Sequence, residues 1–169
     1  NMFLMLDEPK KALVHYLQAL EYTPTTEPIE VFQSYYSLAY CYDRLDELSE
    51  SEYFYNKALG LRITEIGYLP KTVYFKMMAD AYHFVDRYID AEFFIDKVLQ
   101  APHDEVSSYD LMELHFMKGA IENNREADDL AKSHYLKSIQ YGNVVRDTVL
   151  YPETLFNLGL TMSLMGESD

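Results

Sequence analysis

The chain has 169 residues, and its 28 acidic against 14 basic side chains give a formal net charge of −14. A hydrophobic content of 49% is enough to build a buried core, so the composition argues against intrinsic disorder. The acidic excess argues against direct nucleic-acid binding, which uses clustered Lys and Arg, and no apolar run approaches the roughly 18 residues of a membrane helix. The single cysteine, Cys41, excludes a disulfide framework and suits a reducing, cytoplasmic location.

Apolar residues that recur at helical spacing predict an all-α chain without strands. Several prolines support the boundaries, because Pro9, Pro28, Pro70 and Pro152 stand where helices can begin. In chain order the predicted helices span residues 8–21, 29–44, 47–63, 69–85, 88–100, 107–123, 127–141 and 152–165. The connectors are short, so we expect one domain over residues 1–169: a first helix, three helix pairs (29–63, 69–100 and 107–141) and a final helix.

A repeat with a forty-residue period runs through these helices. Its first block pairs large residues with a small one, and the small residue recurs at Ala39, Ala79, Gly119 and Gly159. A second block with a small–large–small pattern follows the first three copies, and an earlier copy of it, Ala12, Tyr16 and Ala19, is one residue out of register. Small residues on facing sides allow two helices to approach closely, so each copy is predicted to form a helix pair.

These blocks resemble the tetratricopeptide repeat (TPR) family over residues 32–65 and 72–105, in part over 112–145, and in the first helix alone over 152–165. The resemblance implies a right-handed superhelical solenoid of antiparallel helix pairs with a concave groove. The family period is about 34 residues, so the longer unit of this chain must lengthen helices or connectors. The third copy departs most, with Lys118 and Glu122 at apolar positions; we expect an ion pair between them on a helix rotated outward, and the alternative is a polar notch.

The longer period and the aromatic stretch 74–82 resemble, more narrowly, the TPR domains of peptide-sensing regulators of Gram-positive bacteria. These are Rap-type phosphatases and related transcription factors, and the resemblance implies a signalling peptide bound in the groove. Their N-terminal effector domain is missing, and the chain opens midway through a repeat. We therefore expect these residues to be a fragment of a longer bacterial protein.

The sequence contains no convergent set of residues that could carry out catalysis. The five histidines show neither HxxxH nor HExxH spacing, and one cysteine cannot build a thiolate cluster, so we expect no metal and no cofactor. Most acids fall at turns and helix starts, where they favour the positive end of the helix dipole. The sequence therefore predicts a chain without catalytic residues of its own.

The predicted binding site lies on the first helix of each pair, which lines the concave side in the TPR family. Aromatic side chains offer adaptable apolar area, and amides match both edges of a peptide bond. Lys76 or Arg44 is expected to hold a carboxylate, and Asp80 or Glu113 a basic side chain. The alternative is that these residues are only the wetter side of ordinary helices. The candidate groove residues are Gln33, Tyr36, Tyr40, Arg44, Lys76, Asp80, His83, Phe116, Asn123 and Asn157.

Three functions are consistent with this sequence. The first is a non-catalytic module that binds a partner peptide or protein, such as a signalling-peptide sensor. The second is a part of a Rap-type response-regulator phosphatase whose catalytic segment lies outside this chain. The third is a scaffold that self-associates through its terminal helices, 8–21 and 152–165, each of which would expose an apolar side.

Overall fold

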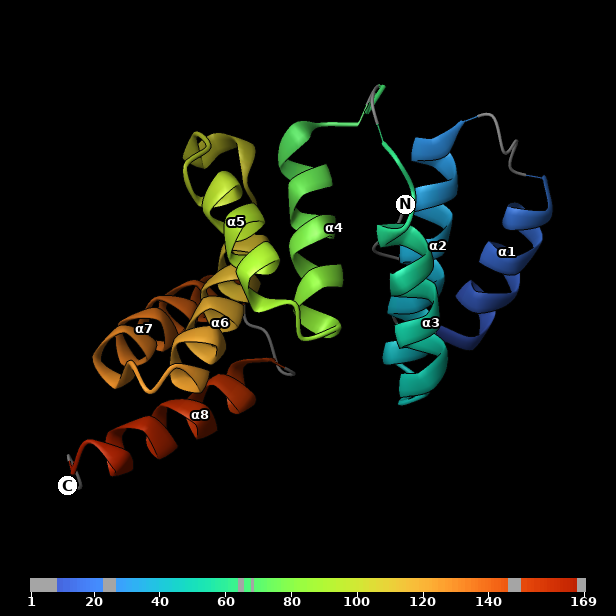
Figure 1. Ribbon diagram of the computed structural model, residues 1–169. Coiled ribbons are helices and arrows are strands. Elements are labelled where there is room, and N and C mark those ends of the chain that lie inside the picture. The colour runs from blue at the N-terminus through green and yellow to red at the C-terminus, as the bar shows by residue number, and fades with distance from the viewer. Residues whose placement is uncertain (1–8, 23–26, 64–65, 68, 146–149, 167–169) are drawn as a thin grey trace. The chain divides into compact units, whose positions relative to one another are not determined.

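The computed structural model describes residues 9–22, 27–63, 66–67, 69–145 and 150–166, apart from the side chain of His103 (Figure 1). Within these ranges the chain forms α-helices, a short 3₁₀ helix at His103–Glu105 and no strand, which confirms the all-α class. The helices are α1 (Pro9–Tyr22), α2 (Pro28–Asp43), α3 (Leu48–Leu59), α4 (Lys71–Phe84), α5 (Tyr88–Leu99), α6 (Ser108–Asn124), α7 (Asp128–Val145) and α8 (Leu150–Leu164).

Two predicted helix ends are displaced by a full turn. α3 ends at Leu59 rather than at 63, because Gly60 is a poor helix former and the amide of Leu61 turns back to the carbonyl of Ala58 at 3.1 Å. α7 continues to Val145 rather than ending at 141. Its Gly142 is buried, and a Cβ there would lie 2.8 Å from the ring of Tyr151, so close packing against α8 holds this turn helical although glycine disfavours it.

The same turn joins the two helices of every pair. Asp46, Asp86 and Glu126 occupy one position of the repeat, and they have positive φ angles of 60°, 57° and 60°. In each copy the next amide donates to a carbonyl further back in the helix, over 2.9–3.0 Å, and this is the hydrogen bond of a Schellman motif. The repeat seen in the sequence is therefore also a repeat of backbone geometry.

The described contacts divide the chain into two compact units, residues 1–87 and 88–169. In the first unit α1 packs on α2, α2 on α3, and α3 on α4. Ala39 is fully buried where α3 crosses α2, and its carbonyl accepts a hydrogen bond from Ser51 Oγ at 2.9 Å. The core of this unit is built from Phe32, Leu38, Tyr55 and Ala58.

In the second unit α6 lies between α5 and α7, and α8 packs on α7 and α6. Gly119 lies directly under the ring of Tyr135, where an added Cβ would be 2.7 Å from a ring carbon. Leu158 of α8 packs with Ala131 and Tyr135 of α7 in the buried core. The small residue of the repeat therefore has the same role in both units: it lets the second helix approach.

Candidate functional site

A hydrogen-bonded group of three predicted site residues joins α2 to α4. The Tyr36 hydroxyl donates to Asp80 Oδ2 at 2.5 Å, and Lys76 Nζ donates to the same oxygen at 2.7 Å. The Lys76 and Asp80 side chains are only 14% and 13% exposed, so their ion pair is shielded from water. The structure thus pairs these two charges with one another, whereas the sequence analysis assigned each of them a separate charge on a ligand.

Aromatic rings hold this group in place. The Tyr36 ring lies between the rings of Phe32 and Tyr40, and the centroid of each is 6.4 Å from the Tyr36 centroid. Tyr36 also meets Tyr55 edge-on, with centroids 5.8 Å apart. Tyr55 is fully buried, and burial, with the nearby carboxylate of Asp80, raises its pKa well above the usual value. Packed aromatic rings therefore surround one neutralised ion pair, and we call this side of α2 and α4 the wall.

The other predicted residues of the first unit lie on the same helices. Gln33 and Tyr40 are half-buried, and Arg44 is exposed directly after the end of α2. His83 is half-buried, and desolvation lowers its pKa despite the opposing attraction of two nearby aspartates. At neutral pH this histidine is therefore uncharged.

In the second unit the three predicted residues have structural contacts. Phe116 packs against the buried Tyr135, with ring centroids 6.1 Å apart. Asn123 Oδ1 accepts a hydrogen bond from the buried Thr161 at 3.3 Å, which joins α6 to α8. Asn157 is half-buried, and its main-chain oxygen accepts from the same hydroxyl at 2.9 Å. This cluster is consistent with a role in holding α8 in place.

A pair of histidines was missed by the sequence analysis. Nδ1 of His115 lies 3.0 Å from Nδ1 of His134, the two rings stack at 5.2 Å, and Tyr141 stacks on His115 at 5.9 Å. The signal was present in the repeat, because these positions correspond to Tyr35 and Phe54 of the first copy, whose rings are also in contact. His115 is buried, only 7% exposed, at the position where the first copy carries Tyr35.

Both members of this pair are held neutral. Burial, the partner ring and nearby lysines lower the pKa of His115 to about 4, and burial with two lysines lowers that of His134. Two carboxylates partly oppose this effect on the pKa of His134. The charged groups that face the pair are Glu92 and Asp96 from α5, Lys118 from α6 and Lys137 from α7.

The ion pair predicted between Lys118 and Glu122 is wrong. Lys118 bonds to Asp96 of α5, and Glu122 pairs with Arg125 at 3.5 Å, while Arg125 also reaches Glu92 at 2.8 Å. α5 supplies carboxylates that pair with the basic side chains of α6 and its C-cap, and the spacing of residues within one helix could not predict partners on another. These polar side chains therefore cross-link α5 and α6.

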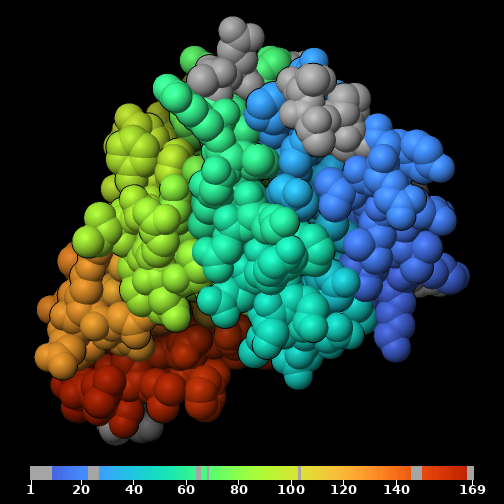
Figure 2. Space-filling view, turned by 45° about the vertical axis from the view of Figure 1, so that its right-hand side comes forward, coloured from blue at the N-terminus to red at the C-terminus, as the bar shows by residue number. Residues whose placement is uncertain are grey.

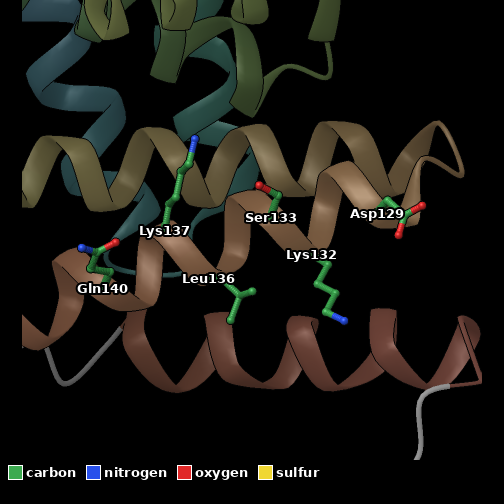
Figure 3. Close-up of a pocket in the computed structure, with 6 residues that line it drawn as sticks. All are labelled: Asp129, Lys132, Ser133, Leu136, Lys137 and Gln140. Atoms are coloured by element: carbon green, nitrogen blue, oxygen red, sulfur yellow. The ribbon is translucent and has the colours of Figure 1, made fainter.

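A shallow hollow of about 490 Å³ runs along α7 and is lined by Asp129, Lys132, Ser133, Leu136, Lys137 and Gln140 (Figure 3). Lys132 and Leu136 point toward α8, whereas Ser133 and Lys137 point away from it. Side chains that diverge in this way cannot close around one ligand. Nor does the described part of the chain contain a group of three or more His, Cys, Asp or Glu placed to hold a metal ion.

Comparison with known proteins finds one family match, over residues 32–62, to the tetratricopeptide repeat. The matched segment is similar to a TPR. It covers most of α2 and all of α3, the first helix pair, and confirms the resemblance predicted there. TPRs generally mediate protein–protein interactions. No curated protein matches the chain, and none of its described helices is long and apolar enough to cross a membrane.

Proposed function

We propose that the inner wall of α2 and α4 binds a peptide segment of a protein partner and performs no chemistry on it. The TPR match supports this function, because the matched residues include Tyr36 and Tyr40 of that wall. The observation that carries the proposal is the bond from Tyr36 to Asp80, which fixes the two inner helix sides against each other. A prearranged surface loses little side-chain entropy when a ligand binds.

The chemistry of the wall favours a peptide of low charge. Asp80 is neutralised by Lys76, and burial keeps His83 uncharged at neutral pH. Tyr40 supplies apolar ring area, and Gln33 carries an amide that can donate to and accept from a peptide bond. We expect selection of apolar side chains and of extended backbone rather than of strongly acidic or basic residues.

A signalling peptide is the finer form of this proposal. The forty-residue period and the stretch 74–82, which resemble peptide-sensing regulators, support it. The alternative is a part of a Rap-type phosphatase, whose catalytic residues would lie outside these 169 residues. In either case the helices of the first unit, α2 and α4, would bind the peptide.

The test is selection of heptapeptides from a random display library, followed by calorimetry of the selected peptides with two variants. Tyr40→Ala removes ring area from the wall, and we expect it to weaken binding about tenfold or more. Tyr53→Ala is the matched control, because Tyr53 is 55% exposed on α3 and lies outside the wall. Equal affinity for both variants, with unchanged melting temperatures, would overturn the site, and recovery of no peptide would overturn the function.

A further inference from the structure

Asp43 is the last residue of α2 and continues the row of wall residues along this helix. The row consists of Gln33, Tyr36, Tyr40 and Asp43, and its steps of three and four residues place all of them on one face. α3 packs along another side of α2 and keeps its own outer side at the surface (Figure 2). Asp43 therefore marks the end of the wall, at the C-terminal end of α2.

The Asp43 carboxylate is half-buried in a place that disfavours its charge. Burial raises its pKa, repulsion from Asp46 adds to this, and attraction to the adjacent Arg44 opposes it. The charge of Asp43, like that of Asp80, also raises the pKa of the buried Tyr55, so it lies near the ring that supports the wall. The C-terminal end of a helix favours cations, so the helix dipole disfavours this carboxylate further. A charge kept at such a position points to a role in binding rather than in stability.

The third copy of the repeat shows which contact Asp43 lacks. Asn123 is at the position of Asp43 in that copy, and it accepts a hydrogen bond from Thr161 of the following first helix at 3.3 Å. In the first unit the residue equivalent to Thr161 is Ala81, which carries no donor. Within the described ranges no hydrogen bond or ion pair reaches the Asp43 carboxylate, so a ligand can supply the missing donor.

The surroundings of this carboxylate suit an ammonium group. Tyr40 precedes Asp43 by one turn on the same face, and the Tyr55 ring is close enough for its pKa to respond to Asp43. An ammonium beside a carboxylate and aromatic rings gains charge-assisted hydrogen bonds and attraction to the rings. Lys76 neutralises Asp80, so Asp43 is the acid of the wall that remains for a ligand.

We propose that Asp43 binds the free α-amino group of the peptide that lies along the wall. The proposal rests on the proposed function and states where the peptide begins. Gln33 and Asp43 are about 15 Å apart along α2, because a helix rises about 1.5 Å per residue. An extended chain covers this distance with about five residues. A cation held at the end of the row is therefore the terminus of the peptide, and the chain runs from Asp43 toward Gln33.

The experiment is calorimetry of the selected heptapeptides in three synthetic forms. The first has a free amino end, the second is acetylated there, and the third is acetylated and carries one added lysine before the selected sequence. Asp43→Asn removes the charge and keeps the shape of the side chain. Asp46→Asn is the matched control, because Asp46 is exposed and asparagine tolerates its positive φ of 60°.

Acetylation should weaken binding to the wild type and to Asp46→Asn about tenfold or more, because a hydrogen bond to a charged group is lost. The same acetylation should change binding to Asp43→Asn by less than about twofold, since the partner is already removed. The lysine form should bind the wild type no better than the acetylated form. The melting temperature of Asp43→Asn without peptide should equal or exceed that of the wild type, because the charge that it removes is disfavoured.

Two results would overturn this proposal and leave the peptide wall standing. One is equal affinity of the wild type for the free and acetylated forms. The other is a lysine form that binds as tightly as the free form, which would assign Asp43 to a side-chain ammonium. A marked fall in the melting temperature of Asp43→Asn would show that the carboxylate stabilises the fold, and would also overturn it. Recovery of no peptide from the library would overturn the proposed function and this proposal together.

Discussion

The pairs α2–α3 and α6–α7 place different chemistry at the same repeat positions. In the first pair Phe54 contacts Tyr35 at 6.1 Å and Tyr42 at 5.5 Å, so three aromatic rings fill the space between the helices. In the second pair the corresponding ring contact is between His115 and His134, and Glu122 takes the place of Tyr42. The small residues and the turn set the helix spacing in both pairs. The remaining positions between the two helices therefore tolerate aromatic rings, imidazoles or charged side chains.

The inner sides of the two first helices differ in a related way. Tyr36 in α2 corresponds to Phe116 in α6, two copies of the repeat later. The hydroxyl of Tyr36 bonds to Asp80 and so fixes a polar group on the wall, whereas Phe116 packs with Tyr135. Tyr36 is buried and Phe116 is half-buried, so the two equivalent positions differ in burial as well as in their partners.

The largest expected effect tests whether the pairs share one packing scheme. Tyr55 and Tyr135 occupy the same repeat position and are 2% and 1% exposed. Replacing either by Ala leaves a cavity, so we expect each variant to lose about 3–5 kcal/mol in urea unfolding. A loss below about 1 kcal/mol in one of them would show that the two pairs are not packed alike.

Lowering the pH should destabilise the pair α6–α7 more than the pair α2–α3. The folded pKa of His115 is about 4, below the unfolded value near 6.5, so the folded state resists protonation. Its contribution to stability is present above pH 6.5 and is lost as the pH falls toward 4, about 2 kcal/mol of it by pH 5. His134 adds to this loss in the same direction, because its pKa is also lowered.

Urea unfolding at pH 7 and pH 5 measures this loss, and the double variant His115→Tyr, His134→Phe is the control. It gives α6 and α7 the residues of α2 and α3 at these positions, so its stability should depend less on pH by about 2 kcal/mol. An unchanged pH dependence would show that the histidine pair is not the acid-sensitive element.

The smallest expected effect concerns the small residue itself. Gly119→Ala places a Cβ 2.7 Å from the buried Tyr135 ring, and the strain exceeds the gain of about 1 kcal/mol in helix propensity. Ala39→Gly loses that propensity and a buried methyl group in the first pair. We expect each change to destabilise its own unit by about 1 kcal/mol, measured by thermal unfolding. Gly159→Ala should stabilise by a similar amount, because no neighbouring helix among the described residues lies within 4 Å of the added Cβ. A stabilising Gly119→Ala would show that the Tyr135 ring can move aside.

The sequence anticipated part of one side-chain cluster. The resemblance to the TPR family predicted that Tyr36, Lys76 and Asp80 line one groove, and the structure brings these three side chains into contact. Spacing could not show that Asp80 accepts from both of the others, because that depends on how closely α2 and α4 approach. The partner of Lys118 was missed for the same reason, since Asp96 belongs to another helix.

The sequence by itself determined the helical class, the forty-residue period and the small residues at which helices cross, because periodicity and side-chain size are local properties. It also indicated turns near Asp46, Asp86 and Glu126, although not their left-handed backbone, since none of the three is a glycine. Only the tertiary structure decided which charges pair and that His115 meets His134. Those outcomes depend on distances between helices, which packing sets and residue spacing does not encode.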